Sequence, residues 1–248
     1  GRWVFSQGVA SWGVLLCLTG LLTAGHVSAG TVVAWGRNNQ GQCNVPSLRS
    51  NVVAISAGGD CHSMALKSDR TVAVWGSAGS LRAVPENLTN ATAIAAGYAH
   101  SLALRSDGTV AAWGSSAGTN LPAGLSQMAA IAAGVDFSLA LCTTGTVTAW
   151  GTNNYGQCNV PAGLNNVMAV AAGMYHSLAL RADGTVAAWG GNTYGQCNIP
   201  AGLSNVVAIS AGYYFSLALK ADGTVVAWGS NSSGLCDVPE DLTNVVAI

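Results

Sequence analysis

Short stretches of alternating apolar and small or polar residues recur along most of this chain. The segments 216–220 (SLALK) and 224–229 (TVVAWG) follow this pattern and contain apolar and β-branched residues, which is typical of half-buried β-strands. Asp-Gly pairs at Asp107, Asp183 and Asp222 lie between such segments, and this dipeptide favours tight hairpin turns. The pattern therefore predicts short antiparallel strands that are joined by hairpins.

These segments recur with a period of about 39 residues, which a Trp-Gly dipeptide marks. From residue 30 onward, the tryptophans of this dipeptide are Trp35, Trp75, Trp113, Trp150, Trp189 and Trp228. A complete unit, beginning at Asn205, contains three clear strands and a turn-rich segment that we interpret as a weak fourth strand. Repeats of this length that hold four strands and no helix are typical of propeller blades. The sequence therefore predicts an all-β fold, a β-propeller of four-stranded blades.

The repeated motifs A-G-x-x-H-S-L-A-L, D-G-T-V, A-W-G and N-x-Y-G-Q resemble the repeat of the regulator of chromosome condensation family. The resemblance is to the short form found in secreted bacterial propellers, and the chain is also similar to the second type of secreted β-lactamase inhibitor protein. It covers Gly30 to Ile248 and implies a ring of seven blades. At about 39 residues a blade, this segment provides about five and a half blades. We therefore expect an incomplete ring and a sequence that is truncated at both ends.

The first 29 residues differ in composition from the rest. Val14 to Ala24 form an uncharged apolar run, and Val27-Ser28-Ala29 provides small residues where a signal peptidase cuts. We predict that residues 1–29 are a signal peptide or an N-terminal anchor and that residues 30–248 are propeller repeats. The protein is then secreted or displayed at the cell surface, and it contacts a membrane only if the anchor stays uncleaved.

The composition limits the classes of partner. Charged residues make up 8% of the chain, and nine basic against ten acidic residues leave a net charge of −1, so no basic surface for nucleic acid is expected. A secreted protein does not meet cytosolic small GTPases, the partners that the resemblance suggests. No phosphate-binding glycine loop, nucleophile elbow or zinc motif is present in the sequence, and we expect no cofactor, no metal and no catalytic residue.

Several conspicuous residues have a structural interpretation because each occupies one fixed position of the repeat. The Trp-Gly tryptophans are expected to pack between blades. His62, His100 and His176 share a position with Phe137 and Phe215, so the ring is used for packing. Cys43, Cys158, Cys197 and Cys236 also share one position, and equivalent points of neighbouring blades are too far apart for disulfides. Whether Cys61 and Cys142 form a disulfide stays open.

Antiparallel strand order predicts which loops share a face. The loops that follow A-G and the loops that follow W-G emerge on one face, while the A-D-G turns and the P-A-G-L segments emerge on the opposite face. All six tyrosines fall on the first face, where the repeats differ most. We interpret Tyr155 and Tyr194 as structural parts of N-x-Y-G-Q. The predicted binding residues are Tyr98, Asp136, Met174, Tyr175, Tyr213, Tyr214, Asn153 and Asn192, although the two asparagines have an alternative role in loop turns.

The leading hypothesis is a secreted or cell-surface propeller that binds an unidentified protein or glycan through its tyrosine-bearing face, and that is not an enzyme. One alternative is a carbohydrate-active lyase or hydrolase at the propeller mouth, with Asp60 and Asp136 as a possible carboxylate pair. Another is an inhibitor of a secreted enzyme such as a β-lactamase. A third is a passive spacer in a larger surface protein.

Overall fold

The computed structural model describes residues 32–48, 51–59, 62–77 and 79–248. The predicted signal peptide or anchor, residues 1–29, lies outside these ranges, as do Asp60 and Cys61. Within the described part of the chain, no helix has the length and apolar character that crossing a membrane requires.

Five separate antiparallel sheets form the described structure, and each has three strands in sequence order. We name them blade 1 (β1–β3) to blade 5 (β13–β15). The strands are β1 (Val52–Ala57), β2 (His62–Lys67), β3 (Val72–Gly76), β4 (Ala91–Ala96), β5 (His100–Arg105), β6 (Val110–Gly114), β7 (Met128–Ala133), β8 (Phe137–Cys142), β9 (Val147–Gly151), β10 (Val167–Ala172), β11 (His176–Arg181), β12 (Val186–Gly190), β13 (Val206–Ala211), β14 (Phe215–Lys220) and β15 (Val225–Gly229). Short 3-10 turns, η1 (Gly79–Arg82) and η2 (Ala117–Thr119), follow blades 1 and 2.

The predicted all-β propeller with an incomplete ring is confirmed, but the predicted fourth strand is wrong for the described residues. The turn-rich segments between blades, such as residues 152–166, are loops. Backbone bonds such as Asn159 N to Gly156 O and Leu164 N to Pro161 O close turns inside this segment, and no part of it joins one of the described sheets. Local turn chemistry therefore replaces the fourth strand.

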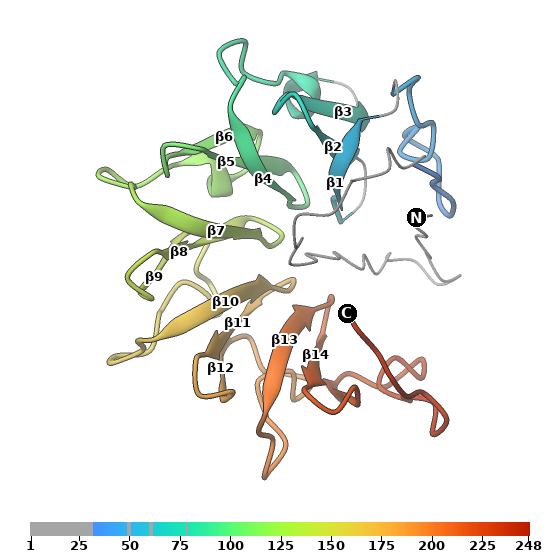
Figure 1. The fold of residues 1–248 in the computed structure, drawn as a ribbon, viewed down its shortest axis with the longest axis vertical. Coiled ribbons are helices and arrows are strands. Elements are labelled where there is room, and N and C mark those ends of the chain that lie inside the picture. Colours follow the sequence, from blue (N-terminus) through green and yellow to red (C-terminus); the bar gives the residue numbers. More distant parts are fainter. Residues whose placement is uncertain (1–31, 49–50, 60–61, 78) are drawn as a thin grey trace.

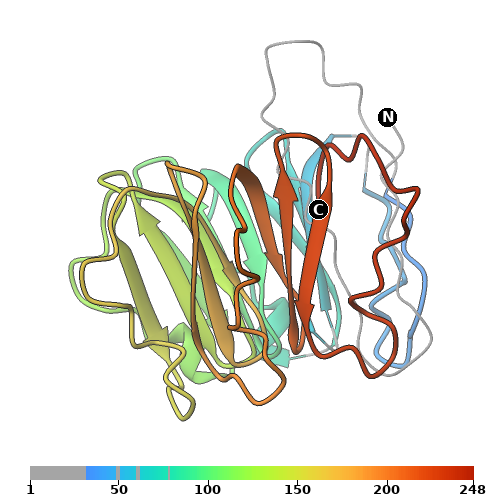
Figure 2. The same ribbon diagram turned by 90° about the horizontal axis from the view of Figure 1, so that it is seen from below.

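The blades follow one another around a partial ring (Figure 1). The first strand of each blade contacts the first two strands of the preceding blade, so β4 lies against β1 and β2, and β13 lies against β10 and β11. The strands run between the two faces of the ring (Figure 2). Because β1, β4, β7, β10 and β13 also contact one another in succession, these first strands are the innermost ones.

The hydrophobic core is divided into clusters that lie between successive blades. The cluster between blades 1 and 2, for example, joins Met64 and Leu66 to Ala103 and Trp113. Trp113 is 6% exposed, and its indole Nε1 donates to the backbone oxygen of Leu81 in the loop before blade 2. The same bond, 2.8 to 2.9 Å long, is formed by Trp75, Trp150, Trp189 and Trp228. The predicted packing of these tryptophans between blades is therefore confirmed.

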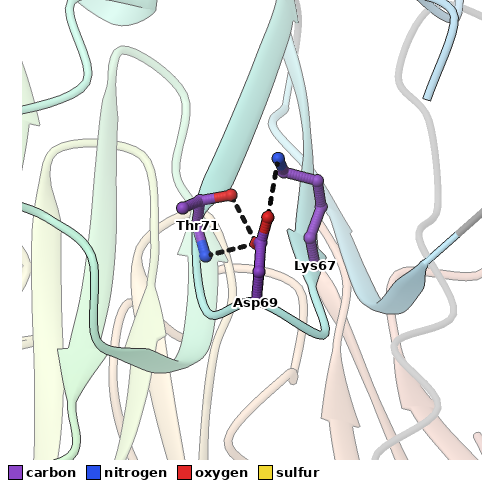
Figure 3. Close-up of polar contacts among 3 residues, drawn as sticks. All are labelled: Lys67, Asp69 and Thr71. Atoms are coloured by element: carbon purple, nitrogen blue, oxygen red, sulfur yellow. Dashed lines mark hydrogen bonds and ion pairs between the residues drawn. The ribbon is translucent and has the colours of Figure 1, made fainter. Parts of the chain in front are cut away.

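Aspartates close the hairpin between the second and third strands in blades 1, 2, 4 and 5, whereas blade 3 has Thr144 at this position. In blade 1, the backbone N and Oγ1 of Thr71 donate to Asp69, and Lys67 pairs with the same carboxylate (Figure 3). These hydrogen bonds hold the pKa of Asp69 below its ordinary value. Asp107, Asp183 and Asp222 make the same two bonds to a threonine. These carboxylates are thus turn-forming groups, as expected from the Asp-Gly pattern.

The Ala-Gly pairs lie where the blades converge. A Cβ on Gly97 would come within 2.4 Å of the His100 ring and 2.6 Å of the Gly134 oxygen in blade 3. Tyr98 N, in the same loop, donates to that oxygen at 3.2 Å. Only glycine leaves room for the ring and for this contact between blades.

The histidines at the repeated ring position lie in the interfaces between blades. The Nε2 atoms of His62, His100 and His176 lie 2.9 to 3.0 Å from the Oγ of Ser101, Ser138 and Ser216 in the following blade. Ser216 Oγ donates its proton to the oxygen of Gln196, so His176 Nε2 must donate to Ser216. Burial lowers the pKa of each of these histidines from 6.5 to about 4.

We predict that these histidines make the fold sensitive to acid. Between pH 6.5 and about 4 the unfolded chain binds protons that the folded chain excludes, so stability is complete above pH 6.5 and falls as the pH drops through this window. Each histidine contributes up to about 3 kcal/mol of this loss. Urea unfolding at pH 7, 5.5 and 4.5 measures it.

The variant His176→Phe is a matched control because Phe137 and Phe215 already occupy this repeat position. It is expected to keep its stability at pH 7 and to lose about a third of the pH dependence, since it removes one of three equivalent groups. An unchanged pH dependence in this variant would show that the buried histidines do not cause it.

Arg70 gives a second prediction about stability. It has a φ of 63° at the hairpin position where the other four blades have glycine with a φ of 77° to 80°. A side chain at positive φ is strained, so Arg70→Gly should raise the free energy of unfolding by roughly 0.5 to 1 kcal/mol. Gly184→Ala should lower it, and urea titrations of both variants measure the difference. A loss of stability in Arg70→Gly would contradict this account.

Candidate functional site

The candidate site lies on the face where the first and third strands of each blade end. Since the three strands of a blade are antiparallel, the loop after the first strand and the loop after the third strand emerge on this face. Backbone bonds join the two loops of one blade: Gly191 N donates to Tyr175 O in blade 4, and Ser230 N donates to Tyr214 O in blade 5. Loops far apart in sequence therefore form one continuous surface.

Five tyrosine rings contact one another on this surface, and we call them the tyrosine patch: Tyr155, Tyr175, Tyr194, Tyr213 and Tyr214. The ring centroids of Tyr155 and Tyr175 are 4.5 Å apart, and those of Tyr194 and Tyr214 are 4.6 Å apart. Tyr175 and Tyr214 join these two pairs at 6.4 Å, and Tyr213 meets Tyr214 edge-on at 4.7 Å. These separations are favourable for aromatic pairs.

The two pairs are related by the repeat. Tyr155 comes from the loop after blade 3 and meets Tyr175 of blade 4, whereas Tyr194 comes from the loop after blade 4 and meets Tyr214 of blade 5. Tyr155 is 53% exposed and Tyr194 is 51% exposed, while Tyr175 and Tyr214 are half-buried beneath them. The outer tyrosines thus offer rigid apolar area to the solvent.

Buried glutamines position the outer tyrosines. Gln157 Oε1 accepts a hydrogen bond from Tyr155 N, and Gln196 Oε1 accepts one from Tyr194 N, both at 2.9 Å. Gln157 and Gln196 are almost fully buried. Their backbone oxygens also accept the indole bonds of Trp189 and Trp228. The same residues therefore join the core between blades to the tyrosine patch.

The side chains of Asn153 and Asn192 close these loops. Asn153 Oδ1 accepts from Cys158 N at 2.8 Å, and its Nδ2 donates to Asn159 Oδ1 at 2.7 Å. Asn192 makes the same two bonds with Cys197 and Asn198. Both ends of each amide are thus used inside the loop, as the turn-forming alternative requires, and the role of these asparagines in binding stays a prediction.

Asp136 occupies the repeat position that Tyr175 and Tyr214 occupy in the next two blades. Its backbone oxygen accepts a bond from Thr152 N, which ties it to the loop that carries Tyr155. Burial, together with Tyr155 and the charge of Asp136, raises the pKa of Tyr175. Burial and the neighbouring tyrosines raise the pKa of Tyr214 as well. These phenols therefore stay neutral and act as apolar area with a hydroxyl group rather than as acids.

The other predicted binding residues are placed differently. Met174 belongs beside the patch, since its backbone N donates to Tyr213 O at 3.3 Å. Tyr98 lies on the same face but in blade 2, against Gly59 of blade 1. The structure thus gathers Asp136, Met174, Tyr175, Tyr213 and Tyr214, and it places Tyr98 on another part of the face.

Sequence reasoning missed Tyr155 and Tyr194 as candidate site residues because they belong to a repeated motif. A repeated position can be structural in its backbone and still expose its side chain. The signal that could have found them is the order of the loops: the loop that follows one blade lies beside the A-G loop of the next blade, as the Tyr155 and Tyr175 contact shows.

The described residues hold little other candidate chemistry. They contain no group of three histidines, cysteines or acidic residues that could bind a metal ion. Cys43, Cys142, Cys158, Cys197 and Cys236 are free thiols. Burial raises the pKa of Cys158 and Cys197 to about 11, so these two are poor nucleophiles. Asp60, which the enzyme alternative paired with Asp136, lies outside the described residues.

Comparison with known families identifies the repeat. The regulator of chromosome condensation (RCC1) repeat matches four tandem segments, residues 91–117, 128–157, 168–196 and 206–235. These segments begin at or next to the first strands of blades 2 to 5 and end in the loops after their third strands. The expected resemblance to the regulator of chromosome condensation repeat is therefore confirmed. A comparison with curated proteins gave no match.

Solved structures share this fold. Prp20p from Saccharomyces cerevisiae, described with its binding to Gsp1p and histones, is 24% identical with a TM-score of 0.65, over 79% of this chain and 61% of Prp20p. The ectodomain of the receptor kinase CR4 from Physcomitrella patens is 25% identical with a TM-score of 0.63, over 72% of this chain and 51% of that one. The chain thus spans between about half and three fifths of the length of these proteins.

The role of the buried glutamines can be tested with Gln196→Leu. The corresponding position of the next repeat is Leu235, so leucine is compatible with the repeat. We expect a loss of roughly 1 kcal/mol of stability and a mobile Tyr194 that no longer holds its ring against Tyr214. Nuclear Overhauser effects between the Tyr194 and Tyr214 rings measure this contact.

The same spectra contain an internal control, because the Tyr155 and Tyr175 contact depends on Gln157 and should be unchanged. If the Tyr194 and Tyr214 contact persists in Gln196→Leu, the glutamine does not position the outer tyrosine.

Proposed function

We propose that this chain, which is built from tandem regulator of chromosome condensation repeats, is a protein-binding propeller whose contact surface is the tyrosine patch. The coarser part follows from the repeat and the fold, which suggest a protein-binding module. The assignment to the patch rests on one observation: five tyrosine rings from three successive loop sets are packed together, with the two outermost about half exposed.

Binding through the tyrosine patch costs little conformational entropy. Tyrosine supplies a large rigid area and a hydroxyl group, and it is enriched among residues that dominate binding energy. Tyr175 and Tyr214 are already held by their neighbours, and the backbones of Tyr155 and Tyr194 are fixed by buried glutamines. A partner that lands on this surface therefore orders few side chains.

We also propose that the protein acts outside the cell and binds rather than catalyses. The apolar run and the small residues before Gly30 support the first statement. The second is supported by the raised pKa of the Tyr175 and Tyr214 phenols and by the burial of His62, His100 and His176 inside blade interfaces. These phenols and imidazoles are therefore poor candidates for a catalytic acid, base or nucleophile.

Site-specific photo-crosslinking tests the proposed surface. With a photoreactive amino acid in place of Tyr194, cells that make the protein should yield a defined crosslinked protein. The same amino acid in place of Met168, which is 60% exposed at the start of β10 and thus at the opposite face, should not. Equal crosslinking from both positions, or crosslinking to saccharide alone, would contradict the proposal.

For the partner identified in this way, the double variant Tyr155→Ala/Tyr194→Ala should weaken binding by about 2 kcal/mol or more, roughly thirtyfold, because both exposed rings are lost. The free energy of unfolding should change little, since these side chains are half exposed. Met168→Ala is the control and should bind normally. Calorimetric titration measures all three affinities.

A further inference from the structure

The charges of the chain are divided unevenly between its two halves. Residues 1–105 contain seven of the nine basic residues and three of the ten acidic residues. Residues 106–248, which include the whole tyrosine patch, contain two basic and seven acidic residues, a net charge of −5. The net charge of −1 for the whole chain hides this difference.

The two basic residues of this acidic half lie away from the patch. Arg181 ends β11 and Lys220 ends β14, and both strands run from the tyrosine face to the opposite face. Lys220 is paired with Asp222 in the hairpin turn at 2.9 Å. The patch therefore has no basic side chain from blades 3 to 5 beside it.

Acidic residues lie on the face of the patch instead, and the charge of Asp136 acts on Tyr175. Asp136 stands at its blade 3 end, in the repeat position of Tyr175 and Tyr214. Asp237 follows blade 5, where its Oδ1 accepts a bond from Asn231 Nδ2 in the loop after β15. The remaining acidic residues of this half are Asp107, Asp183 and Asp222 in the turns of the opposite face and Glu240 and Asp241 in the P-E-D-L segment.

We propose that the tyrosine patch takes a basic segment of a partner protein, with arginine or lysine side chains lying on the tyrosine rings and Asp136 as the residue that selects positive charge. This inference rests on the proposed function and specifies its partner. A cation is attracted to the face of an aromatic ring, and the attraction increases when the site is partly desolvated. A carboxylate beside the rings adds to that attraction.

The same features disfavour other partners. An acidic segment would meet Asp136, and no basic side chain of blades 3 to 5 lies beside the patch to compensate for the repulsion. A neutral glycan would stack on tyrosine but would gain nothing from the charge of this half. Charge complementarity therefore favours a basic protein segment over both.

Three capped heptapeptides provide a direct test. They have the same alternating glycine framework and carry three arginines, three glutamines or three glutamates. The tyrosine ring signals of isotope-labelled protein report binding in nuclear magnetic resonance titrations. The arginine peptide should shift the signals of Tyr155, Tyr175, Tyr194 and Tyr214 and bind at least about fivefold more tightly than the glutamine peptide. Its affinity should fall as the salt concentration rises, and the glutamate peptide should not bind.

Two variants locate the cation. Asp136→Asn should weaken the arginine peptide by about twofold to fivefold and leave the glutamine peptide unchanged. Glu240→Gln, which removes the same charge from the P-E-D-L segment, is the matched control and should bind as the unaltered protein does. Equal affinity for the arginine and glutamine peptides, or no effect of Asp136→Asn, would overturn the selection of positive charge.

The failure of this inference can be separated from a failure of the proposed function. If the partner found by crosslinking still depends on Tyr155 and Tyr194 while the arginine peptide shows no preference, the patch binds protein but does not select cations. If a neutral tetrasaccharide shifts the tyrosine signals and no peptide does, both proposals are wrong. If the arginine peptide depends on Asp136 but not on Tyr155 and Tyr194, the cation site lies beside the patch, and the role of the rings is overturned.

Discussion

The fold depends on one contact that is repeated between every pair of neighbouring blades. Each buried tryptophan packs in the apolar cluster between its own blade and the preceding one, and its indole N–H donates to a backbone oxygen in the loop between them. A single repeat unit, here a three-stranded sheet, cannot bury its apolar face without its neighbours. The indole bond fixes the loop that separates two blades, and the apolar cluster fixes their angle. The loops that form the tyrosine patch are therefore positioned by the core.

Much of the architecture could be predicted from the sequence because each position can be compared with the equivalent positions of the other repeats. The Phe137 and Phe215 substitutions at the histidine position indicated a packing role, and the structure places those histidines inside blade interfaces. The fourth strand could not be predicted correctly by the same route. Segments such as residues 152–159 keep the repeat length, but their asparagine and glycine residues satisfy the backbone within the loop. Periodicity measures the length of a unit and does not show which of its segments bond to a neighbouring strand.

Comparison between repeats predicted only part of the candidate site. Variation between repeats pointed to Tyr175, Tyr213 and Tyr214, and the structure brings these rings together. The same reasoning assigned Tyr155 and Tyr194 to structure because their motif recurs, yet they are the most exposed rings of the patch. Asn153 and Asn192, in the same motif, are used inside the loop. In this repeated motif, some residues close the loop with hydrogen bonds and others expose their side chains. Only the contacts between loops of successive blades distinguish these two roles.

The charge distribution, together with the shape of the surface, determines which partners the patch selects. In a ring of similar blades, stacked rings alone would discriminate weakly between partners, because every apolar or planar group can pack on tyrosine. Specificity needs a position where the symmetry of the repeat is broken by charge. Asp136 is such a position: it replaces, in one blade, the tyrosine that the next two blades present, and it does so in the half of the chain that lacks basic residues beside the patch. The carboxylate costs little there because it is not buried, and it excludes anionic partners that the rings alone would accept.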